Sequence, residues 1–157
     1  MTALRPAEPG DVAAIMAVER ASFPTDAWSE AMMADTLAGG DVVATVAEDA
    51  GGLVGYAAVL APAGAADADV LILAVAEPAR GRGLGRALLD GLLEAASRRG
   101  ARRLFLEVRA DNPVAQSLYT SSGFEAVGRR PRYYQPDDVD AVVMVRELAA
   151  PPAGAVL

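Results

Sequence analysis

The spacing of hydrophobic residues changes several times along this chain, and each change predicts a new element. Apolar residues crowd together in three stretches, as expected for strands buried in a sheet: 42–48, 53–60 and 70–75. The segment 86–93 is amphipathic at helical spacing. In 102–108, Leu104, Leu106 and Val108 alternate with Phe105, Glu107 and Arg109, which predicts a strand with the two sets on opposite faces.

Caps and turn residues set the limits of the other elements. Asp11, Ser29 and Asn112 each precede a helical stretch and can cap it, which predicts helices to about residues 23, 38 and 122. Pro113 at the first helical position and Gly123 after the last one suit the third helix. Gly100 ends a helix that reaches about residue 99. Further strands are expected at 2–6, 125–130 and 141–148, with a loop over 131–140.

The order of these elements predicts an α/β fold of the α+β kind. Hairpins and strand–helix–strand units occur in one chain, so the sheet should be mixed and covered by helices. At 157 residues the chain suits a single domain, which we assign to 1–148. The segment 149–157 is rich in Pro, Ala and Gly and is expected to be a flexible tail.

Composition excludes several kinds of chemistry. The chain has no Cys, no His and no Lys, and all 14 basic side chains are Arg. Disulfides, thiol nucleophiles, Ser-His-Asp triads, His-based metal sites and Schiff bases are therefore excluded. The net charge of −7 argues against nucleic acid as a partner and suits a basic one. No apolar run reaches the length of a membrane span and no signal peptide is recognisable, so a cytoplasmic protein is expected.

The segment Arg80–Arg86 carries the most information about function. It follows an apolar strand, contains three glycines and opens an amphipathic helix. Backbone N–H groups at a helix N-terminus can hold phosphate oxygens, and glycine lets the main chain approach a ligand closely. A dinucleotide fingerprint would need glycine at 86 or 88, where Arg86 and Leu88 stand. The spacing thus favours a different phosphorylated cofactor, and a glycine-rich turn without a ligand is the alternative.

Glu107 and Tyr119 are the candidate acid–base residues. Glu107 is near the end of a strand expected to be covered on both faces, where a carboxylate is costly unless it is paired or functional. It can serve an amine as a general base, directly or through water, and pairing with Arg109 is the alternative. Tyr119 follows Asn112 by seven residues, on nearly the same helix face. Its hydroxyl can donate a proton to a leaving thiolate, and packing against the core is its alternative.

These features resemble the GNAT superfamily of acetyl-CoA-dependent N-acetyltransferases. The spacing Arg80-x-x-Gly83-x-Gly85 is similar to the pyrophosphate loop of that family. Other stretches resemble one subgroup, the bacterial ribosomal-protein-alanine N-acetyltransferases of the RimI type: Phe23-Pro24, Trp28-Ser29-Glu30, Leu73-Ala74-Val75, Leu106 to Asn112, Leu118-Tyr119, Gly123-Phe124, Arg129-Arg130, Tyr133-Tyr134 and Asp140 to Met144. They occur in order over nearly the whole domain. The resemblance implies a GNAT-like acyl-CoA N-acyltransferase fold, a mostly antiparallel mixed sheet of about seven strands with four helices.

The resemblance also implies roles for individual residues. Backbone groups would pair with the pantetheine arm of acetyl-CoA and polarise its thioester carbonyl at Leu73, Ala74 and Val75. Pyrophosphate would be bound by the loop residues Arg80, Gly81, Arg82, Gly83, Leu84, Gly85 and Arg86. Asn112 and Tyr119 would contact the cofactor, with Glu107 as the base and Tyr119 as the acid. The acceptor amine would be bound among Phe23, Trp28, Glu107, Tyr133 and Tyr134, and no metal is implied.

The implied function is acetyl transfer from acetyl-CoA to the N-terminal α-amine of a protein. In the subgroup, the target is the N-terminal alanine of the eighteenth small-subunit ribosomal protein. Without a Cys to carry the acetyl group, direct attack by the amine in a ternary complex is expected. Acetylation of a small amine, such as a polyamine or an aminoglycoside, and non-catalytic binding of acyl-CoA are the alternatives. The aspartates of 137–140 are candidates to attract a basic peptide, and the arginines of 129–132 to meet an outer phosphate of the cofactor.

Overall fold

Seven strands form a single sheet in the computed structural model, which describes residues 2–148. The strands are β1 (Ala3–Pro6), β2 (Val42–Asp49), β3 (Gly52–Leu60), β4 (Asp67–Val75), β5 (Arg103–Arg109), β6 (Glu125–Tyr134) and β7 (Val139–Glu147). Their order in the sheet is β1-β2-β3-β4-β5-β7-β6, and every neighbouring pair is antiparallel except β4 and β5. This confirms the mixed, mostly antiparallel sheet. The predicted tail, 149–157, lies outside the described residues.

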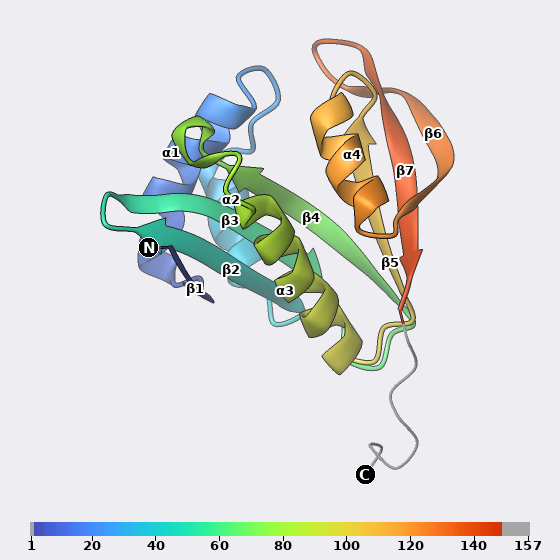
Figure 1. Ribbon diagram of the computed structural model, residues 1–157, viewed down its shortest axis with the longest axis horizontal. Coiled ribbons are helices and arrows are strands. Elements are labelled where there is room, and N and C mark those ends of the chain that lie inside the picture. Colours follow the sequence, from blue (N-terminus) through green and yellow to red (C-terminus); the bar gives the residue numbers. More distant parts are fainter. Residues whose placement is uncertain (1, 149–157) are drawn as a thin grey trace.

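Within residues 2–148, four α-helices cover the two faces of this sheet: α1 (Val12–Ser22), α2 (Glu30–Leu37), α3 (Leu84–Arg98) and α4 (Pro113–Ser121). α1 and α2 pack on one face, and α3 and α4 pack on the other (Figure 1). Two short 3-10 turns, η1 (Pro9–Asp11) and η2 (Glu77–Ala79), lie before α1 and after β4. The helices predicted from the sequence are thus all present.

Each face of the sheet has its own hydrophobic core. Leucines of α3 pack against Leu104, Leu106 and Val108 of β5, which are 0%, 3% and 6% exposed. This confirms the predicted alternation along β5. The core under α1 and α2 includes the fully buried Met33 and Tyr56. Because full burial of one large apolar side chain contributes about 1.5–3 kcal/mol, these cores fix both helix layers on the sheet.

The predicted caps of α2 and α4 are confirmed, whereas the cap of α1 differs. The Oγ of Ser29 accepts the N–H of Met32 at 3.1 Å, and the Oδ1 of Asn112 accepts the N–H of Ala115 at 3.1 Å. Asp11 does precede α1, but its carboxylate caps no N–H of that helix. It instead accepts the N–H of Glu8 at 2.7 Å and pairs with an arginine of β1. The turn η1 in front of α1 therefore takes the oxygens that were expected to cap the helix.

Strand limits differ from the prediction where the sequence is polar. β4 begins at 67 rather than 70, and β6 continues to 134, which shortens the predicted loop 131–140 to the turn 135–138. β6 is an edge strand and is exposed along almost its whole length, so it has no buried face that hydrophobic alternation could reveal. Its register against β7 shifts between 130 and 134, where Arg132 has a φ of 55°.

The parallel pair β4 and β5 is short and then separates. The two strands are in register only from Asp67 with Arg103 to Asp69 with Phe105, and beyond these residues they diverge (Figure 1). The other edge of β4 stays paired with β3 as far as Val75. The divergence therefore opens the middle of the sheet and leaves one edge of β4 without a strand partner over 70–75.

Candidate functional site

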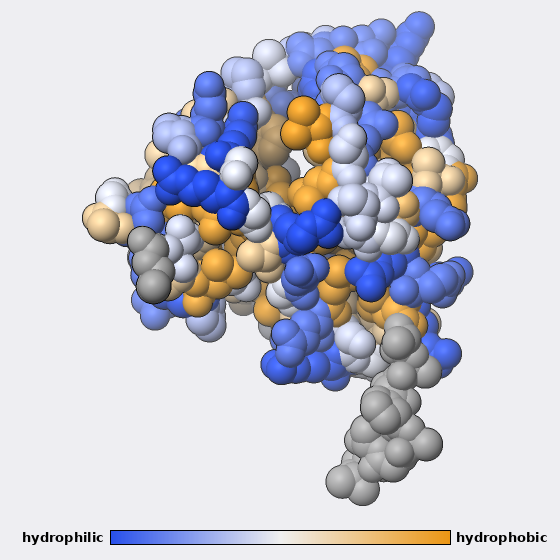
Figure 2. Space-filling model, viewed as in Figure 1, coloured by the Kyte–Doolittle hydropathy of each residue, from blue (hydrophilic) through white to orange (hydrophobic). Residues whose placement is uncertain are grey.

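A cavity of about 400 Å³ lies where β4 and β5 diverge. It is lined by 70–73 of β4 and 106–109 of β5, and Figure 2 shows this face hollowed beside α4, with hydrophobic residues around the opening. A second cavity of about 410 Å³ shares part of this lining. The first cavity brings together eight of the predicted site residues: Phe23, Trp28, Leu73, Glu107, Asn112, Tyr119, Tyr133 and Tyr134. Of these, the second cavity is also lined by Trp28, Glu107, Tyr133 and Tyr134.

The predicted glycine loop, residues 80–86, leads from η2 into the N-terminus of α3. Gly81 and Gly83 both have a φ of +81°, a left-handed conformation that costs residues with a Cβ about 1–2 kcal/mol. A Cβ built at either position has no atom within 4 Å, so their backbone faces open space. Within residues 2–148 the N–H groups of 81–86 have no protein acceptor, and the first helical bond runs from Ala87 N–H to Gly83 O at 3.0 Å. The loop thus presents consecutive free donors at the positive end of a helix dipole.

Side chains fix this loop against β4 and α4. The Nε of Arg80 donates to the carbonyl of Val75 at 2.9 Å, which ties the loop to the end of β4. Arg86 donates to the Oγ of Ser122 at 3.1 Å and to the Oγ of Ser121. A Cβ at Gly85 would come within 3.3 Å of a methyl group of Leu118, so glycine permits this close packing of α3 on α4. The donors are therefore held in a fixed position beside the cavity-lining helix α4.

Tyr119 projects from α4 and is 8% exposed. Burial raises the pKa of Tyr119 to about 12. Its ring meets Phe124 edge to face, with 5.8 Å between the ring centres. Burial is the only cause of this pKa shift, with no hydrogen bond from the described chain contributing to it, and the side chain lines the first cavity together with Asn112. The phenol is therefore protonated at neutral pH and available to a ligand.

Glu107 projects from β5 and lines both cavities. Its side chain is 30% exposed, and Arg130 Nε lies 3.0 Å from its Oε2. This approach is an ion pair without hydrogen-bond geometry, so the buried Oε2 accepts no hydrogen bond within the described chain. The alternative pairing with Arg109 does not occur, because Arg109 pairs with three aspartates instead. Glu107 thus lines both cavities, and its buried Oε2 lies beside Arg130 without a hydrogen bond of its own.

Glu19 is a cavity-lining carboxylate that the sequence analysis did not single out. It is 1% exposed and accepts hydrogen bonds from the N–H of Trp28, at 2.9 Å, and from the hydroxyl of Tyr56. Burial raises the pKa of Glu19, and these two donors offset part of that shift. A sequence signal was present, because Glu19 follows Ile15 by four residues and Met16 by three, on the apolar face of α1.

The charged residues of 129–140 interact with other charged residues of the chain. Asp137 lies 3.1 Å from a nitrogen of Arg109, Asp138 lies 3.6 Å from one of Arg132, and Asp140 lies 3.4 Å from one of Arg129. Arg130 is the partner of Glu107. Each of these residues thus has a partner of opposite charge within the described chain, and the roles toward a basic peptide and an outer phosphate stay predictions.

Two further features concern metals and membranes. Among residues 2–148, no three acidic side chains are grouped as a metal site would require. In the same part of the chain no helix is long and apolar enough to cross a membrane.

Comparison with known proteins shows the family of the chain. The model of the acetyltransferase (GNAT) family matches residues 12–124. The chain belongs to the GNAT family. It is 42% identical over 107 residues to the N-alpha-acetyltransferase RimI of Mycobacterium tuberculosis, an alignment that covers 67% of this chain and 66% of that protein. Across three curated bacterial relatives, the matched part spans between 39% and 66% of their length.

Solved structures of other GNAT proteins share the fold. The ribosomal-protein-S18-alanine N-acetyltransferase of Escherichia coli superimposes with a TM-score of 0.83 at 28% identity, and the match covers 100% of both chains. Arabidopsis thaliana NAA60 in complex with acetyl-CoA superimposes with a TM-score of 0.84 at 22% identity, over 94% of this chain and 98% of that chain. The first of these likenesses agrees with the RimI-type resemblance, and the second shows the fold alone.

Acetyl-CoA is the cofactor of the GNAT family, and the residues of this chain fit its chemistry. The free N–H groups of 81–86 suit a pyrophosphate, and the open space at Gly81 and Gly83 leaves room for it. The unpaired edge of β4 offers main-chain donors and acceptors to the amide groups of a pantetheine arm. This edge leads from the glycine loop to Leu73 in the cavity wall.

Proposed function

We propose that this chain transfers the acetyl group of acetyl-CoA to the N-terminal α-amine of a protein, in a ternary complex. The observation that carries the proposal is the meeting of Glu107 and Tyr119 in one cavity at the end of the unpaired β4 edge. The names of the bacterial relatives support the same reaction class. Holding an amine beside a fixed acyl group contributes up to about 7–11 kcal/mol toward the barrier.

The proposed cofactor site combines the glycine loop with β4 and Asn112. N–H groups of Gly81 to Arg86 would hold the pyrophosphate, with the arginines of the loop adding positive charge. The edge of Leu73 to Val75 would pair with the pantetheine arm, and Asn112 lines the wall beside it. Bound acetyl-CoA supplies an activated acyl thioester with a thiolate leaving group.

Glu107 is proposed to take the proton of the acceptor amine. A protein α-amine has a pKa of about 7.7–8.0, so a large share is protonated at neutral pH and a weak base suffices. The buried Oε2 of Glu107 accepts no hydrogen bond within the described residues, and Arg130 holds the side chain at 3.0 Å. The side chain of Glu107 is 30% exposed and lines both cavities, so an amine bound in either one would lie near it.

Tyr119 is proposed to donate a hydrogen bond to the departing sulfur. Its pKa of about 12 lies above that of an ordinary thiol, about 8.5, so complete proton transfer to a thiolate is uphill by roughly 5 kcal/mol. A charge-assisted hydrogen bond needs no such transfer and still stabilises the thiolate. The acid role implied by the family resemblance is thus narrowed to that of a hydrogen-bond donor.

The acceptor is proposed to be a protein N-terminus that begins with alanine and is rich in arginine. Phe23, Trp28, Tyr133 and Tyr134 line the cavity around Glu107 and would flank the first residues of a peptide. The relative from Escherichia coli is named for the alanine of ribosomal protein S18. The overall charge of −7 favours the approach of a basic protein.

The deciding experiment measures thiol release from acetyl-CoA in the presence of an Arg-rich peptide that begins with alanine. We expect release with this peptide and none with the same peptide carrying a blocked N-terminus. A polyamine and an aminoglycoside are assayed in parallel. Release with these amines and none with the peptide would overturn the proposed acceptor, and binding of acetyl-CoA without release for any amine would overturn the proposed activity.

A further inference from the structure

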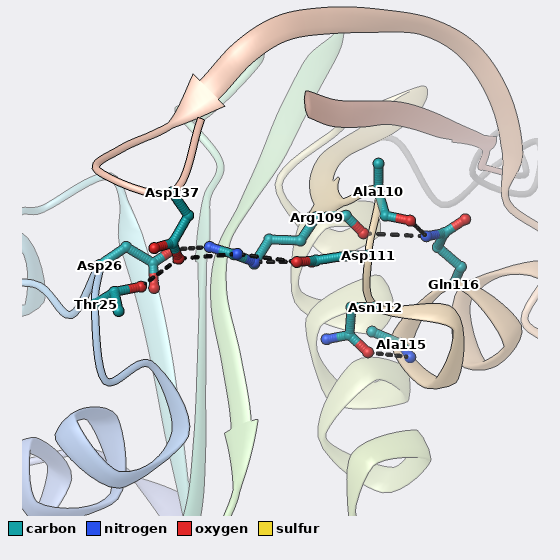
Figure 3. Close-up of polar contacts among 9 residues, drawn as sticks. All are labelled: Thr25, Asp26, Arg109, Ala110, Asp111, Asn112, Ala115, Gln116 and Asp137. Carbon is teal, nitrogen blue, oxygen red and sulfur yellow. Dashed lines mark hydrogen bonds and ion pairs between the residues drawn. The ribbon is translucent and has the colours of Figure 1, made fainter. Parts of the chain in front are cut away.

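Arg109 joins three segments that are far apart in the sequence (Figure 3). It is the last residue of β5, two residues after Glu107. Its guanidinium contacts Asp26 in the α1–α2 loop at 3.2 Å and Asp137 in the β6–β7 turn at 3.1 Å. It also makes two parallel hydrogen bonds to Asp111, at 2.9 and 3.1 Å. Asp111, which follows β5, thus orients the guanidinium, and its remaining N–H groups link the two loops.

The surroundings of Arg109 hold it in this orientation. Its side chain is 18% exposed, and its guanidinium carbon lies 5.4 Å from the ring centre of Tyr134. Thr25 of the α1–α2 loop donates its hydroxyl to Asp137 at 2.5 Å, a second link between the same two loops. Asp26, at 16% side-chain exposure, has little water to replace Arg109 as a partner.

The linked loops carry residues of the proposed acceptor site. Asp26 and Trp28 of the α1–α2 loop and Tyr134 and Gln135 beside the turn all line the first cavity. Arg109 itself also lines it. The links therefore run along the cavity wall, where they set the distance between the Trp28 side and the Tyr134 side.

We propose that Arg109 is a positioning residue. Its contacts with Asp26 and Asp137, called the Arg109 bridge, hold the α1–α2 loop and the β6–β7 turn together and thereby shape the acceptor site. This inference rests on the proposed function. One guanidinium offsets three carboxylates, so loss of its charge leaves Asp26 and Asp137 as close like charges that repel. The two loops then separate, and the acceptor must close them when it binds.

The test compares Arg109→Met with Arg103→Met. Arg103 is a matched control, because it is also on β5, pairs with Asp67 at 2.9 Å and lies over an aromatic ring, but lines neither cavity. We expect Arg109→Met to raise the KM for the alanine peptide about tenfold or more, with kcat within about threefold and the Kd of acetyl-CoA unchanged. Arg103→Met should leave all three values unchanged. An unchanged peptide KM in Arg109→Met, or equal losses of kcat and cofactor affinity, would overturn the proposal.

Hydrogen exchange gives a readout that does not depend on catalysis. In Arg109→Met, the amides of 23–29 and 135–138 should exchange faster by about tenfold or more, while those of β5 and α3 keep their rates. Equal rates in wild type and variant would refute the bridge even if the protein acetylates no amine at all, so this outcome is distinct from failure of the proposed function.

Asp137→Asn, at the 32% exposed end of the link, tests the same bridge if Arg109→Met does not fold. It should shift the same amides in the same direction, and unchanged amides would again refute the bridge.

Discussion

The glycine loop and the Arg109 bridge stand at different parts of one site and are built differently. The loop uses consecutive N–H groups of 81–86, whose positions follow from the backbone of Gly81 and Gly83. The bridge uses side-chain charges from segments 83 and 28 residues away from Arg109. A backbone site loses little side-chain entropy on binding a ligand, whereas a bridge of long side chains must be kept ordered by its partners. In the proposed site, the cofactor side is thus set by local backbone and the acceptor side by tertiary contacts.

This difference has a consequence for salt. The pairs of Arg109 with Asp111 and Asp137, whose side chains are 55% and 32% exposed, weaken as salt is added, whereas the pair with Asp26, at 16%, is screened less. The backbone geometry of the glycine loop does not depend on such pairs. Acceptor binding is therefore the part of the site that solution conditions and surface substitutions can tune.

The largest effect is expected at Glu107, which borders both cavities. Glu107→Gln removes the proposed base but keeps the size and polarity of the side chain, so kcat should fall about 10²–10⁴-fold at neutral pH. The Kd of acetyl-CoA, measured by calorimetry, should stay unchanged because the glycine loop is intact. A fully active variant would remove Glu107 from the mechanism.

Tyr119→Phe tests the cofactor side of the same cavity. Loss of one hydrogen bond to a developing charge costs about 1.5–3 kcal/mol, so kcat should fall about 10- to 100-fold. The KM of the peptide should change little, because no hydrogen bond of this hydroxyl to residues 2–148 contributes to its pKa and the ring that packs in the core is kept. Steady-state kinetics at saturating acetyl-CoA measures this, and unchanged turnover would reduce Tyr119 to a packing residue.

Gly83→Ala tests the claim that the loop works through its backbone. The left-handed φ of +81° should cost alanine about 1–2 kcal/mol, which weakens acetyl-CoA binding about 5- to 30-fold if the loop must keep this conformation. Gly64→Ala is the matched control, because Gly64 has a φ of +79°, open space around its Cβ and a position outside both cavities. Gly64→Ala should lower the free energy of unfolding in urea and leave cofactor affinity unchanged, whereas Gly83→Ala, whose open loop can relax in the free protein, should show its cost in binding. Equal cofactor affinity in the two variants would contradict a role for the loop in binding.

The smallest expected effect concerns Glu19 and the pH dependence of stability. Burial raises its pKa in the folded state above the ordinary value of 4.5, so the folded protein binds this proton more tightly than the unfolded chain does. The free energy of unfolding should therefore fall as pH rises from about the unfolded pKa through the folded one, by at most about 1.4 kcal/mol per pH unit. Glu19→Gln should lack this slope in urea titrations, while Glu125→Gln on the exposed strand β6 should keep it. Identical slopes in all three proteins would exclude Glu19 as the titrating group.

Sequence reasoning succeeded where structure depends on near neighbours. The caps Ser29 and Asn112, the alternation along β5 and the glycine loop each follow from residues within a few positions of one another. It failed at Asp11, where a preceding turn competed for the same carboxylate, and along β6, where an exposed edge leaves no apolar pattern. The Arg109 bridge could not be predicted from the sequence for a different reason, because its partners become neighbours only when the sheet forms.

The early end of the β4–β5 pairing makes the sheet two half-sheets that are joined by only the first residues of each strand. A pantetheine arm that pairs with the free edge of β4 would act as an additional short strand and fill part of the gap. The coenzyme would then be a structural element of the protein as well as its substrate. Its departure after each turnover would loosen the connection between the half that carries the glycine loop and the half that carries Glu107.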